Sequence, residues 1–526
     1  MTTSSSQQAD EAVCPYRRAG VTRRSVLLGA VAAAATAVVG RPGSAFGATA
    51  SGSVTPVTAT TTTGTASGCW SHAVGDPRGT DVAVKVGRTV QGRFGLMFPS
   101  LKAYSPPDDL LSALAGQMVD PRPPMDDVSL STVGDDRSIP SGYVYLGQFL
   151  DHDITRDTTP LDKATADPHA LLNFDTPRLD LASVYGRGPA LDPQLYDPAR
   201  PGYLLLTLSS VGLQDLPRDA NGTAFVGDPR NDENLIITQL QIAVIRLHNT
   251  FMAAGNSFAE AQRLTRWHYQ WVIVNDYLPH VVGPELVNKL LVRKGEKLAS
   301  AGTFYRPKNV KAPMMPLEFS VAAYRFGHSL IRAEYEMHEG STVPLFNGTN
   351  GLDLGGSRPL PPAVQADWNY FFELPGIDAP DDRNFARLVD TQVSLPLANL
   401  PATVVSPGIG AVTSLPERNL LRGKRLGLPS GQAVASAMGI APLSNTALGL
   451  SDPRWGGQAP LWFYVLKESE LLGGQRLGPV GGQIVTEVVL GLLTVDQSSY
   501  FNAETPWAPA GLSFGMGDLL LMAGFV

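Results

Sequence analysis

Apolar residues recur at intervals of three and four positions through the middle of this 526-residue chain. This interval places side chains on one face of an α-helix, so it restricts the fold to one that contains buried helices. The clearest stripe comprises Ile236, Leu240, Val244, Leu247 and Phe251. Asp228 followed by Pro229 suits the start of that helix, and Gly255 suits its end.

Further helices are expected on both sides of this stripe. Ser257 and Glu260 form a capping box that opens a helix running towards Pro279. Apolar patterns predict three more helices, over 319–331, 461–472 and 483–493. Period-two strands are few and short, and the 53 glycines and 42 prolines are typical of long ordered loops. The sequence therefore predicts a mainly α fold, with one large helical domain over 91–526, long loops and little β structure.

Composition excludes several classes of protein. A hydrophobic fraction of 43% is enough for a large core and excludes disorder of the whole chain. The formal net charge of −7 argues against a chain-wide basic surface, so we expect no nucleic-acid partner. The two cysteines, Cys14 and Cys69, are too few for a disulfide scaffold or a cysteine-rich metal site. Any histidine chemistry must draw on only eight histidines.

The N-terminus resembles a twin-arginine export signal. Arg23 and Arg24 directly precede an alanine-rich apolar run that is short for a transmembrane helix, and Ala48-Thr49-Ala50 offers a cleavage site. A membrane anchor and a chance basic-apolar segment are the alternatives. We expect a signal peptide over 1–50, followed over 51–90 by a linker and N-terminal extension rich in Thr, Ala, Ser and Gly. Export would lead to a secreted or cell-envelope protein with no stable membrane span after cleavage.

Three polar clusters interrupt the apolar pattern, at 147–153 (GQFLDHD), 227–233 (GDPRNDE) and 324–331 (YRFGHSLI). On a helix, Asp151 and Asp153 would point about 200° apart, so the first cluster can contact several neighbours at once. Each cluster alone has an ordinary structural explanation. These are a surface Asp-His-Asp, a surface ion pair between Arg230 and Glu233, and a hydrogen-bonded core histidine.

Together the clusters suit a chemistry that cleaves peroxide. His328, which follows Gly327 on an apolar helix, can be the fifth ligand of haem iron, and a second histidine and an arginine can face it across the iron. Cleavage needs a base that takes the proton from the near oxygen and returns it to the departing one. It also needs a fixed cation that stabilises the charge developing on the departing oxygen.

The spacing and the residue sequences of the three clusters resemble those of the animal-type haem peroxidases, which belong to the peroxidase–cyclooxygenase superfamily. The resemblance spans about residues 95–500, with further motifs at 98–101 (FPSL), 248–249 (HN), 367–368 (DW) and 477–482 (LGPVGG). The chain looks like a bacterial member, similar to peroxinectins and myeloperoxidase. The resemblance implies a haem peroxidase that reduces hydrogen peroxide and oxidises halide, thiocyanate or phenolic donors through ferryl haem, in a response to oxidative stress.

The resemblance also assigns roles by motif. On the distal side of the haem, His152 is the acid–base histidine, Arg230 the catalytic arginine and Gln148 the pocket glutamine. On the proximal side, His328 is the iron ligand, and Asn419 hydrogen-bonds its imidazole. That hydrogen bond would make the histidine more anionic and favour higher-valent iron.

Two carboxylates, Asp151 and Glu233, align with those that form ester links to haem methyl groups in mammalian members. The expected cofactor is therefore haem b, and the sequence leaves open whether it is covalently attached. Glu233 is followed by Asn234, so a methionine sulfonium link is not possible at that position.

One calcium site is also implied. Its expected ligands are Asp153, Thr176, the carbonyl of Arg178 and Asp180. Oxygen donors at alternate positions of a loop suit calcium. The usual serine two positions beyond the aspartate is Ala182 here, with Ser183 next to it, so the occupancy of the site is left open. An ordinary turn with Asp180 capping a helix is the alternative.

Two other functions remain open. Fatty-acid dioxygenases of the superfamily place a radical tyrosine three residues before the proximal histidine, where this chain has Arg325. This favours a peroxidase, although another tyrosine could serve. A non-catalytic secreted adhesion protein with the peroxidase fold is the third option. The expected partners are hydrogen peroxide and small electron donors, while the physiological donor and the oligomeric state stay open. His248, His268 and His280 are expected to be structural.

Overall fold

Helices make up most of the secondary structure of this protein. The computed structural model describes residues 92–120, 135–156, 172–173, 177–209, 212–307, 313–402, 404–405, 411–511 and 513–525, all within the unit Gly68–Val526. The expected signal peptide 1–50, the expected linker 51–90, both cysteines and Thr176 lie outside the described residues.

The α-helices include seven of ten residues or more and several shorter ones among the described residues. They are α1 (Asp108–Gln117), α3 (Gly142–Ile154), α4 (Ala182–Tyr185), α5 (Leu235–Ala253), α6 (Phe258–Val272), α7 (Leu278–Val282), α8 (Pro284–Leu290), α9 (Leu415–Arg425), α10 (Gly431–Ala437), α11 (Leu461–Leu471), α12 (Pro479–Val495) and α13 (Met516–Met522). The 3-10 segments are η3 (Pro193–Leu195), η4 (Pro229–Asp232), η7 (Ala323–His328), η8 (Thr349–Gly351), η9 (Pro362–Val364), η10 (Trp368–Tyr370), η11 (Leu395–Ala398), η12 (Pro453–Trp455) and η13 (Tyr500–Asn502). Two π-helical segments are η5 (Ile273–Tyr277) and η6 (Glu318–Ala322).

Strands are short and form small separate sheets. In the three-stranded sheet, β1 (Gly92–Gly95) runs parallel to β8 (Met314–Pro316) and antiparallel to β3 (Leu172–Asn173). The antiparallel pairs are β2 (Asp135–Pro140) with β11 (Phe385–Arg387), β4 (Thr207–Leu208) with β5 (Gln214–Asp215), β6 (Leu291–Lys294) with β7 (Lys297–Ser300), and β9 (Glu334–Glu336) with β10 (Thr342–Pro344). This architecture confirms the predicted mainly α fold with little β structure.

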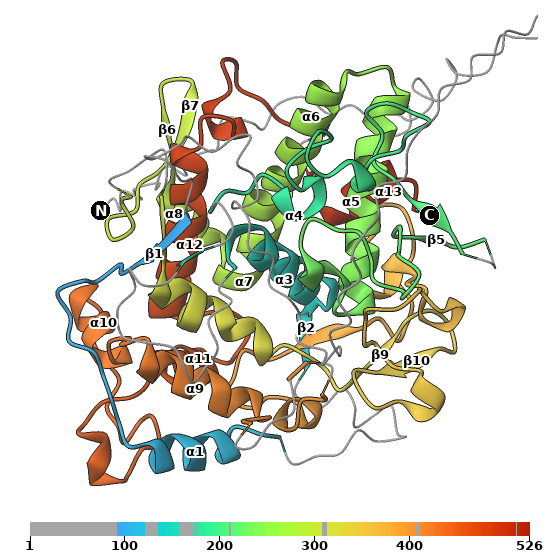
Figure 1. Cartoon of the computed structure of the whole chain (residues 1–526). Helices are drawn as coiled ribbons and strands as arrows, with labels where there is room; N and C mark the ends of the chain where they lie inside the picture. The colour runs from blue at the N-terminus through green and yellow to red at the C-terminus, as the bar shows by residue number, and fades with distance from the viewer. Residues whose placement is uncertain are drawn as a thin grey trace, which may run out of the picture. The chain divides into compact units, whose positions relative to one another are not determined.

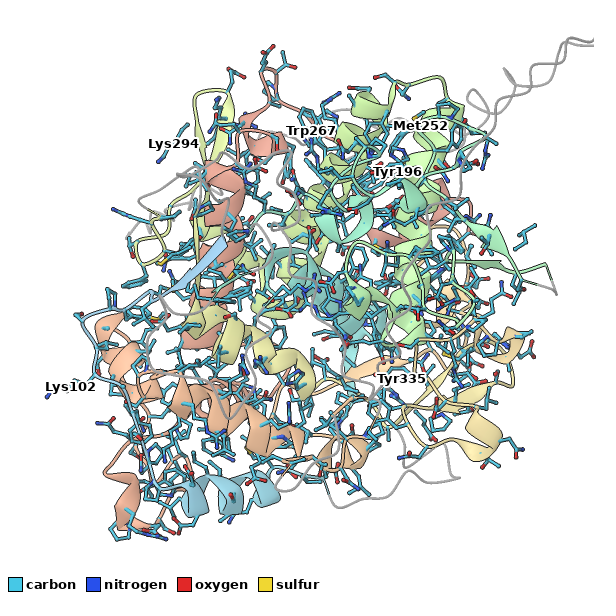
Figure 2. All side chains as sticks on the ribbon, viewed as in Figure 1. Lys102, Tyr196, Met252, Trp267, Lys294 and Tyr335 are labelled. Atoms are coloured by element: carbon cyan, nitrogen blue, oxygen red, sulfur yellow. The ribbon has the colours of Figure 1, made fainter. Side chains whose placement is uncertain are left out.

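Helix α3 lies in the middle of the described domain, with α5 and α6 on one side and α12 on the other (Figure 1). It contacts α5, η4 and η7 directly. Side chains fill the space between these elements, as Figure 2 shows. Tyr335, labelled there, is fully buried and packs its ring at 5.4 Å from that of Tyr145 on α3. The core therefore surrounds the helix that carries the first polar cluster.

The predicted central stripe forms α5, and its first four residues are buried. Its start differs from the expectation. Asn234 caps α5 by accepting a hydrogen bond from the backbone N–H of Ile236 at 2.9 Å, whereas Asp228 caps the preceding 3-10 segment η4. The prediction that the Asp-Pro pair begins the central helix is therefore wrong, because this pair opens a separate single turn that carries Arg230.

The expected capping box is present at α6, where the Ser257 hydroxyl accepts from the N–H of Glu260 at 3.3 Å. The helix then continues through the π-helical η5 into α7 and ends at Gly283, whose φ of 89° suits glycine. The helix predicted over 483–493 is longer in the structure and begins at Pro479.

The segment predicted as one helix over 319–331 is irregular. It consists of the π-helical η6 followed by the 3-10 segment η7, which ends at His328. The buried carboxylate of Glu318 accepts hydrogen bonds from the N–H groups of Met97 and Phe98 at 2.9 and 3.0 Å, so the start of this segment is tied to the chain after β1. Among the described residues, no helix is both long and apolar enough to cross a membrane.

Candidate active site

Helix α3 brings Gln148, Asp151 and His152 to its last turns, and its packing depends on Gly147. A Cβ atom at this position would lie 2.5 Å from the hydroxyl of Tyr277 on η5, which only glycine permits without a shift. The Tyr324 hydroxyl, on η7, donates to the carbonyl of Gly147 at 3.1 Å. Gly147 therefore allows α3 to pack closely on η5, and its carbonyl joins the first polar cluster to the third.

His152 is buried with 3% of its surface exposed, and both ring nitrogens have neighbours. Its Nδ1 lies 2.8 Å from Oδ1 of Asn231 on η4, and the Nδ2 of Asn231 donates to Oε1 of Gln241 on α5 at 2.8 Å. Its Nε2 lies 3.6 Å from Oε1 of Glu233. The second polar cluster therefore packs directly on the first.

Arg230 lies beside His152 and is fixed by several hydrogen bonds. Its Nη2 donates to the backbone carbonyls of His152, at 3.3 Å, and of Thr155. Its Nε and Nη2 also donate to the fully buried carboxylate of Asp228, at 3.2 and 2.8 Å. Nη1 lies 3.7 Å from Oδ2 of Asp151. The guanidinium is thus held against the end of α3, where a charge-assisted bidentate contact sets its orientation.

Two carboxylates, Glu233 and Asp151, lie close to His152 and Arg230. Glu233 accepts a hydrogen bond from Nε2 of Gln148 at 2.9 Å, and 45% of its side chain is accessible. Burial nevertheless raises the pKa of Glu233 to about 7, and burial also raises the pKa of Asp151, whose side chain is 33% accessible.

On the other side, η7 places His328 next to α9. The Nδ1 of His328 lies 2.8 Å from Nδ2 of Asn419, and Arg325 donates to Oδ1 of Asn419 at 2.7 Å. Burial and then the Arg325 charge lower the pKa of His328 to about 3. The ring is therefore neutral at pH 7. Because the Asn419 nitrogen can only donate, Nδ1 of His328 is the acceptor in this contact, and binding of a metal through Nε2 would require the Asn419 amide to turn so that its oxygen accepts from Nδ1.

The two halves of the site are close enough to interact. α3 and η7 are in contact, and the charge of Arg325 on η7 lowers the pKa of Asp151 on α3, against the larger effect of burial. A Cβ atom at Gly327, the neighbour of His328, would meet nothing within 4 Å, so there is open space at this point. The neutral His328 ring and the open space beside Gly327 are the features of this site that fit a prosthetic group bound through its metal.

The expected calcium loop lies behind α3. Asp153 is fully buried, and its Oδ2 accepts from the N–H of Leu181 at 3.0 Å, on a different side of α3 from Asp151 as the helical geometry predicted. Asp180 accepts from the N–H of Ala182 at 3.0 Å. Within the described part of the chain, Oδ2 of Asp180 and Oγ of Ser183 are buried without a hydrogen-bond partner.

The other two expected calcium ligands, Arg178 and Thr176, give less support to a cation site. Arg178 is buried, with its Nη1 at 3.4 Å from Oδ1 of Asp496, and Thr176 is outside the described residues. The described residues contain no group of three or more His, Cys, Asp or Glu side chains arranged to hold a metal ion. Any cation in this loop would therefore depend on backbone and hydroxyl oxygens as well as carboxylates.

Three of the remaining histidines have structural contacts, as expected. His248 contacts the Tyr185 hydroxyl and the Gly202 carbonyl through its two nitrogens, at 3.0 and 2.9 Å. His268 and His280 each contact the carbonyl four residues earlier on their own helix, at 2.7 Å in both cases.

Three residues of the site were not assigned to it from the sequence: Asp228, Asn231 and Gln241. Asp228 and Asn231 flank Arg230 within the second cluster, so their positions carried a signal. Gln241 carried none, because it reaches the site only through the packing of α5 on η4.

Part of the chain is similar to known proteins. Residues 148–353 match the family model of the animal haem peroxidases, a segment that contains Gln148, His152, Arg230 and His328 but not Asn419. Human thyroid peroxidase is 26% identical over 201 residues, 32% of this chain and 20% of that protein. Chorion peroxidase of Aedes aegypti is 31% identical over 140 residues, 23% of this chain and 17% of that protein. The chain therefore matches only about a fifth of the length of these two relatives.

Solved structures share the fold at low identity. Peroxidase A from Dictyostelium discoideum superposes with a TM-score of 0.55 and 16% identity, covering 83% of this chain and 92% of that one. A fatty acid alpha-dioxygenase from Arabidopsis thaliana gives a TM-score of 0.53 and 14% identity, covering 82% and 77%. The helical architecture is therefore one that peroxidases and alpha-dioxygenases have in common.

Proposed function

We propose that this chain is a haem peroxidase, because residues 148–353 match the family model of the animal haem peroxidases. It would reduce hydrogen peroxide in two electrons and then oxidise halide, thiocyanate or phenolic donors. The observation that carries the proposal is the contact between Arg230 and the last turn of α3, which places a fixed guanidinium beside His152.

His328 would hold the haem, because its ring is neutral at pH 7 and lies beside open space at Gly327. When bound, the haem group as a whole would supply the two electrons that reduce the peroxide, and the donors would then restore them. Asn419 contacts Nδ1 of the His328 ring and is itself held by Arg325. We propose Asp151 and Glu233, which lie close to Arg230 and His152, as the carboxylates for covalent attachment. Acid–acetone extraction, which removes only non-covalent haem, tests that attachment.

Proton transfer falls to His152 in this proposal. Its Nε2 lies 3.6 Å from Oε1 of Glu233, and a base there would take the proton from the near peroxide oxygen and return it to the departing oxygen. Arg230 stabilises the negative charge that develops on the departing oxygen, and the buried Asp228 keeps the guanidinium in place. Because the His152 ring is buried, bulk water does not compete for the proton that it would transfer.

Two variants test the proposal. His328→Ala should abolish or grossly shift the Soret band, because the iron loses its protein ligand. His152→Ala should retain the band and lose peroxide turnover by about 10²- to 10⁴-fold, the usual contribution of a general acid–base. Full activity of His152→Ala would show that the distal role is wrongly assigned.

The alternatives predict different results in the same preparations. A fatty-acid dioxygenase would consume oxygen with linoleate and no added peroxide. Arg325 at the position of the dioxygenase tyrosine favours the peroxidase. A non-catalytic adhesion protein would bind haem without peroxide-dependent oxidation of any donor.

We further propose one calcium ion in the loop of Asp153 and Asp180. The buried Asp180 and Ser183 oxygens that lack hydrogen-bond partners among the described residues support it, since buried oxygens of this kind suit a hard cation. Metal analysis of the purified protein before and after chelation tests it, and fewer than one calcium per chain in the untreated protein would contradict it.

Export through the twin-arginine signal is proposed from the sequence alone. Replacing Arg23 and Arg24 together by lysine should retain the protein inside the cell, and unchanged export of that variant would contradict the proposal.

A further inference from the structure

A buried asparagine and a buried glutamine connect His152 to α5. Asn231 is fully buried on η4, with Oδ1 at 2.8 Å from Nδ1 of His152. Its Nδ2 donates to Oε1 of Gln241, which is 1% exposed, at 2.8 Å. The three side chains form a continuous hydrogen-bonded line that begins at the ring proposed to move the peroxide proton.

The direction of these bonds decides where the His152 proton lies. An amide oxygen only accepts and an amide nitrogen only donates. With the Asn231 nitrogen facing the Gln241 oxygen, the Asn231 oxygen faces His152, and Nδ1 of that ring must carry the proton. The Nε2 atom then has its lone pair available on the side of Glu233.

If both amides were rotated, the Asn231 nitrogen would face His152, and Nε2 would carry the proton. A neutral imidazole in that form could not accept a proton at Nε2. The function of His152 as a base therefore depends on the orientation of two amides that do not touch the reacting atoms.

We propose that Asn231 and Gln241 are positioning residues that hold His152 in the tautomer protonated at Nδ1. This inference rests on the proposed function for its consequence, but the tautomer itself can be measured without turnover. Outer partners of this kind fix the tautomer and ring orientation of functional histidines, and their loss commonly costs 10- to 100-fold.

The first measurement is nitrogen NMR of the purified protein labelled with 15N-histidine. Carbon monoxide and dithionite keep any bound iron diamagnetic, and the His152 signals are those that disappear in His152→Gln. We expect a protonated Nδ1 and an unprotonated Nε2 in the unmodified protein. A proton on Nε2 would overturn the inference.

Matched variants separate positioning from general structural damage. Asn231→Leu removes the acceptor at similar volume and should yield mixed His152 tautomers and a 10- to 100-fold slower reaction with peroxide, with an unchanged Soret band. Asn231→Asp keeps an acceptor facing Nδ1 and should retain the tautomer and react within a few-fold of the original rate. Wild-type kinetics in Asn231→Leu would overturn the proposal.

The control is Asn249→Leu on the same helix as Gln241. Asn249 also bridges two backbone groups, the N–H and carbonyl of Leu204, both at 2.9 Å, but it does not contact His152. It should lower stability without changing the His152 signals. An equal change of the His152 signals in Asn249→Leu would overturn the inference, because the tautomer would then depend on the overall stability of α5 and not on Asn231.

A wild-type protein with Nδ1 protonated but no peroxide reaction would support the tautomer assignment and refute the peroxidase proposal.

Discussion

A buried carboxylate, Asp228, is one of the groups that fix the position of the Arg230 guanidinium. Asp228 is fully buried, accepts from Nε and Nη2 of Arg230, and caps η4 by accepting from the N–H of the same residue. The short segment Asp-Pro-Arg therefore supplies its own rigid support. The same three residues occur again at Asp452-Pro453-Arg454, where they cap η12 with nearly the same distances but on an exposed surface.

Asp228→Asn should slow the reaction with peroxide by about 10-fold or more, because charge-assisted hydrogen bonds are roughly twice as strong as neutral ones and the guanidinium loses its bidentate partner. The same change should lower the free energy of unfolding by about 1 to 3 kcal/mol, since a buried charge is left poorly compensated. Stopped-flow kinetics and urea unfolding measure the two effects.

Asp452→Asn is the matched control for Asp228→Asn. Exposed ion pairs contribute little, so this variant should change stability by less than about 1 kcal/mol and leave the peroxide reaction unaltered. Equal effects of the two substitutions would show that the buried site has no special role.

At the level of single residues, the sequence predicted which side chains form the candidate site, but it did not predict every residue that holds them in place. His152, Arg230, Glu233 and Gln148 lie together as their motifs suggested, and His328 lies beside Asn419. The supporting contact to Gln241 could not be predicted, because hydrogen-bond partners in different elements leave no periodic signal. The roles of all these residues remain proposals.

At the level of helices and strands, the sequence likewise predicted some elements and missed the form of others. Apolar stripes and caps predicted α5 and α6, because burial of one helical face repeats at a fixed interval. The same pattern predicted a regular helix over 319–331, but the chain forms the π-helical η6 and the 3-10 segment η7. A fully buried segment has no polar face that would distinguish these helix types. Tertiary contacts, such as those of Glu318 with the chain after β1, decide between them.

Gly147 provides a test of how α3 is placed. Gly147→Ala should lower the free energy of unfolding by about 1 to 3 kcal/mol, because the new Cβ would lie 2.5 Å from the Tyr277 hydroxyl and η5 would have to move. Displacement of η5 should also disturb the contact of Tyr324 with α3 and thus the spacing of the two histidines. Denaturant unfolding and the position of the Soret band report the two consequences.

Gly116→Ala on α1 is the control for that substitution. A Cβ atom there meets nothing within 4 Å, so alanine should stabilise the helix by up to about 1 kcal/mol. If Gly147→Ala were equally harmless, the close packing of α3 on η5 would be contradicted.

For the whole molecule, buried carboxyl groups link stability to pH. Glu468 on α11 is 5% exposed, and its Oε2 accepts from the N–H of Val480 at the start of α12 at 2.9 Å. Burial raises the pKa of Glu468 from 4.5 to about 7, against the opposing effect of its backbone hydrogen bonds. The folded state therefore binds this proton more tightly than the unfolded state does. The resulting stabilisation is fully present below pH 4.5 and is lost as the pH rises through 7.

Glu468→Gln removes this titration while keeping an acceptor for the α12 N–H. Between pH 5 and pH 8, the free energy of unfolding of the variant should therefore improve relative to the unmodified protein by about 2 kcal/mol, as the raised pKa implies. Urea unfolding of both proteins at several pH values measures the difference, with the exposed Glu504→Gln as the control. A difference between variant and unmodified protein that does not change with pH would mean that Glu468 is ionised in the fold at pH 5. In that case its hydrogen bonds to the first turn of α12, rather than its burial, would determine its charge.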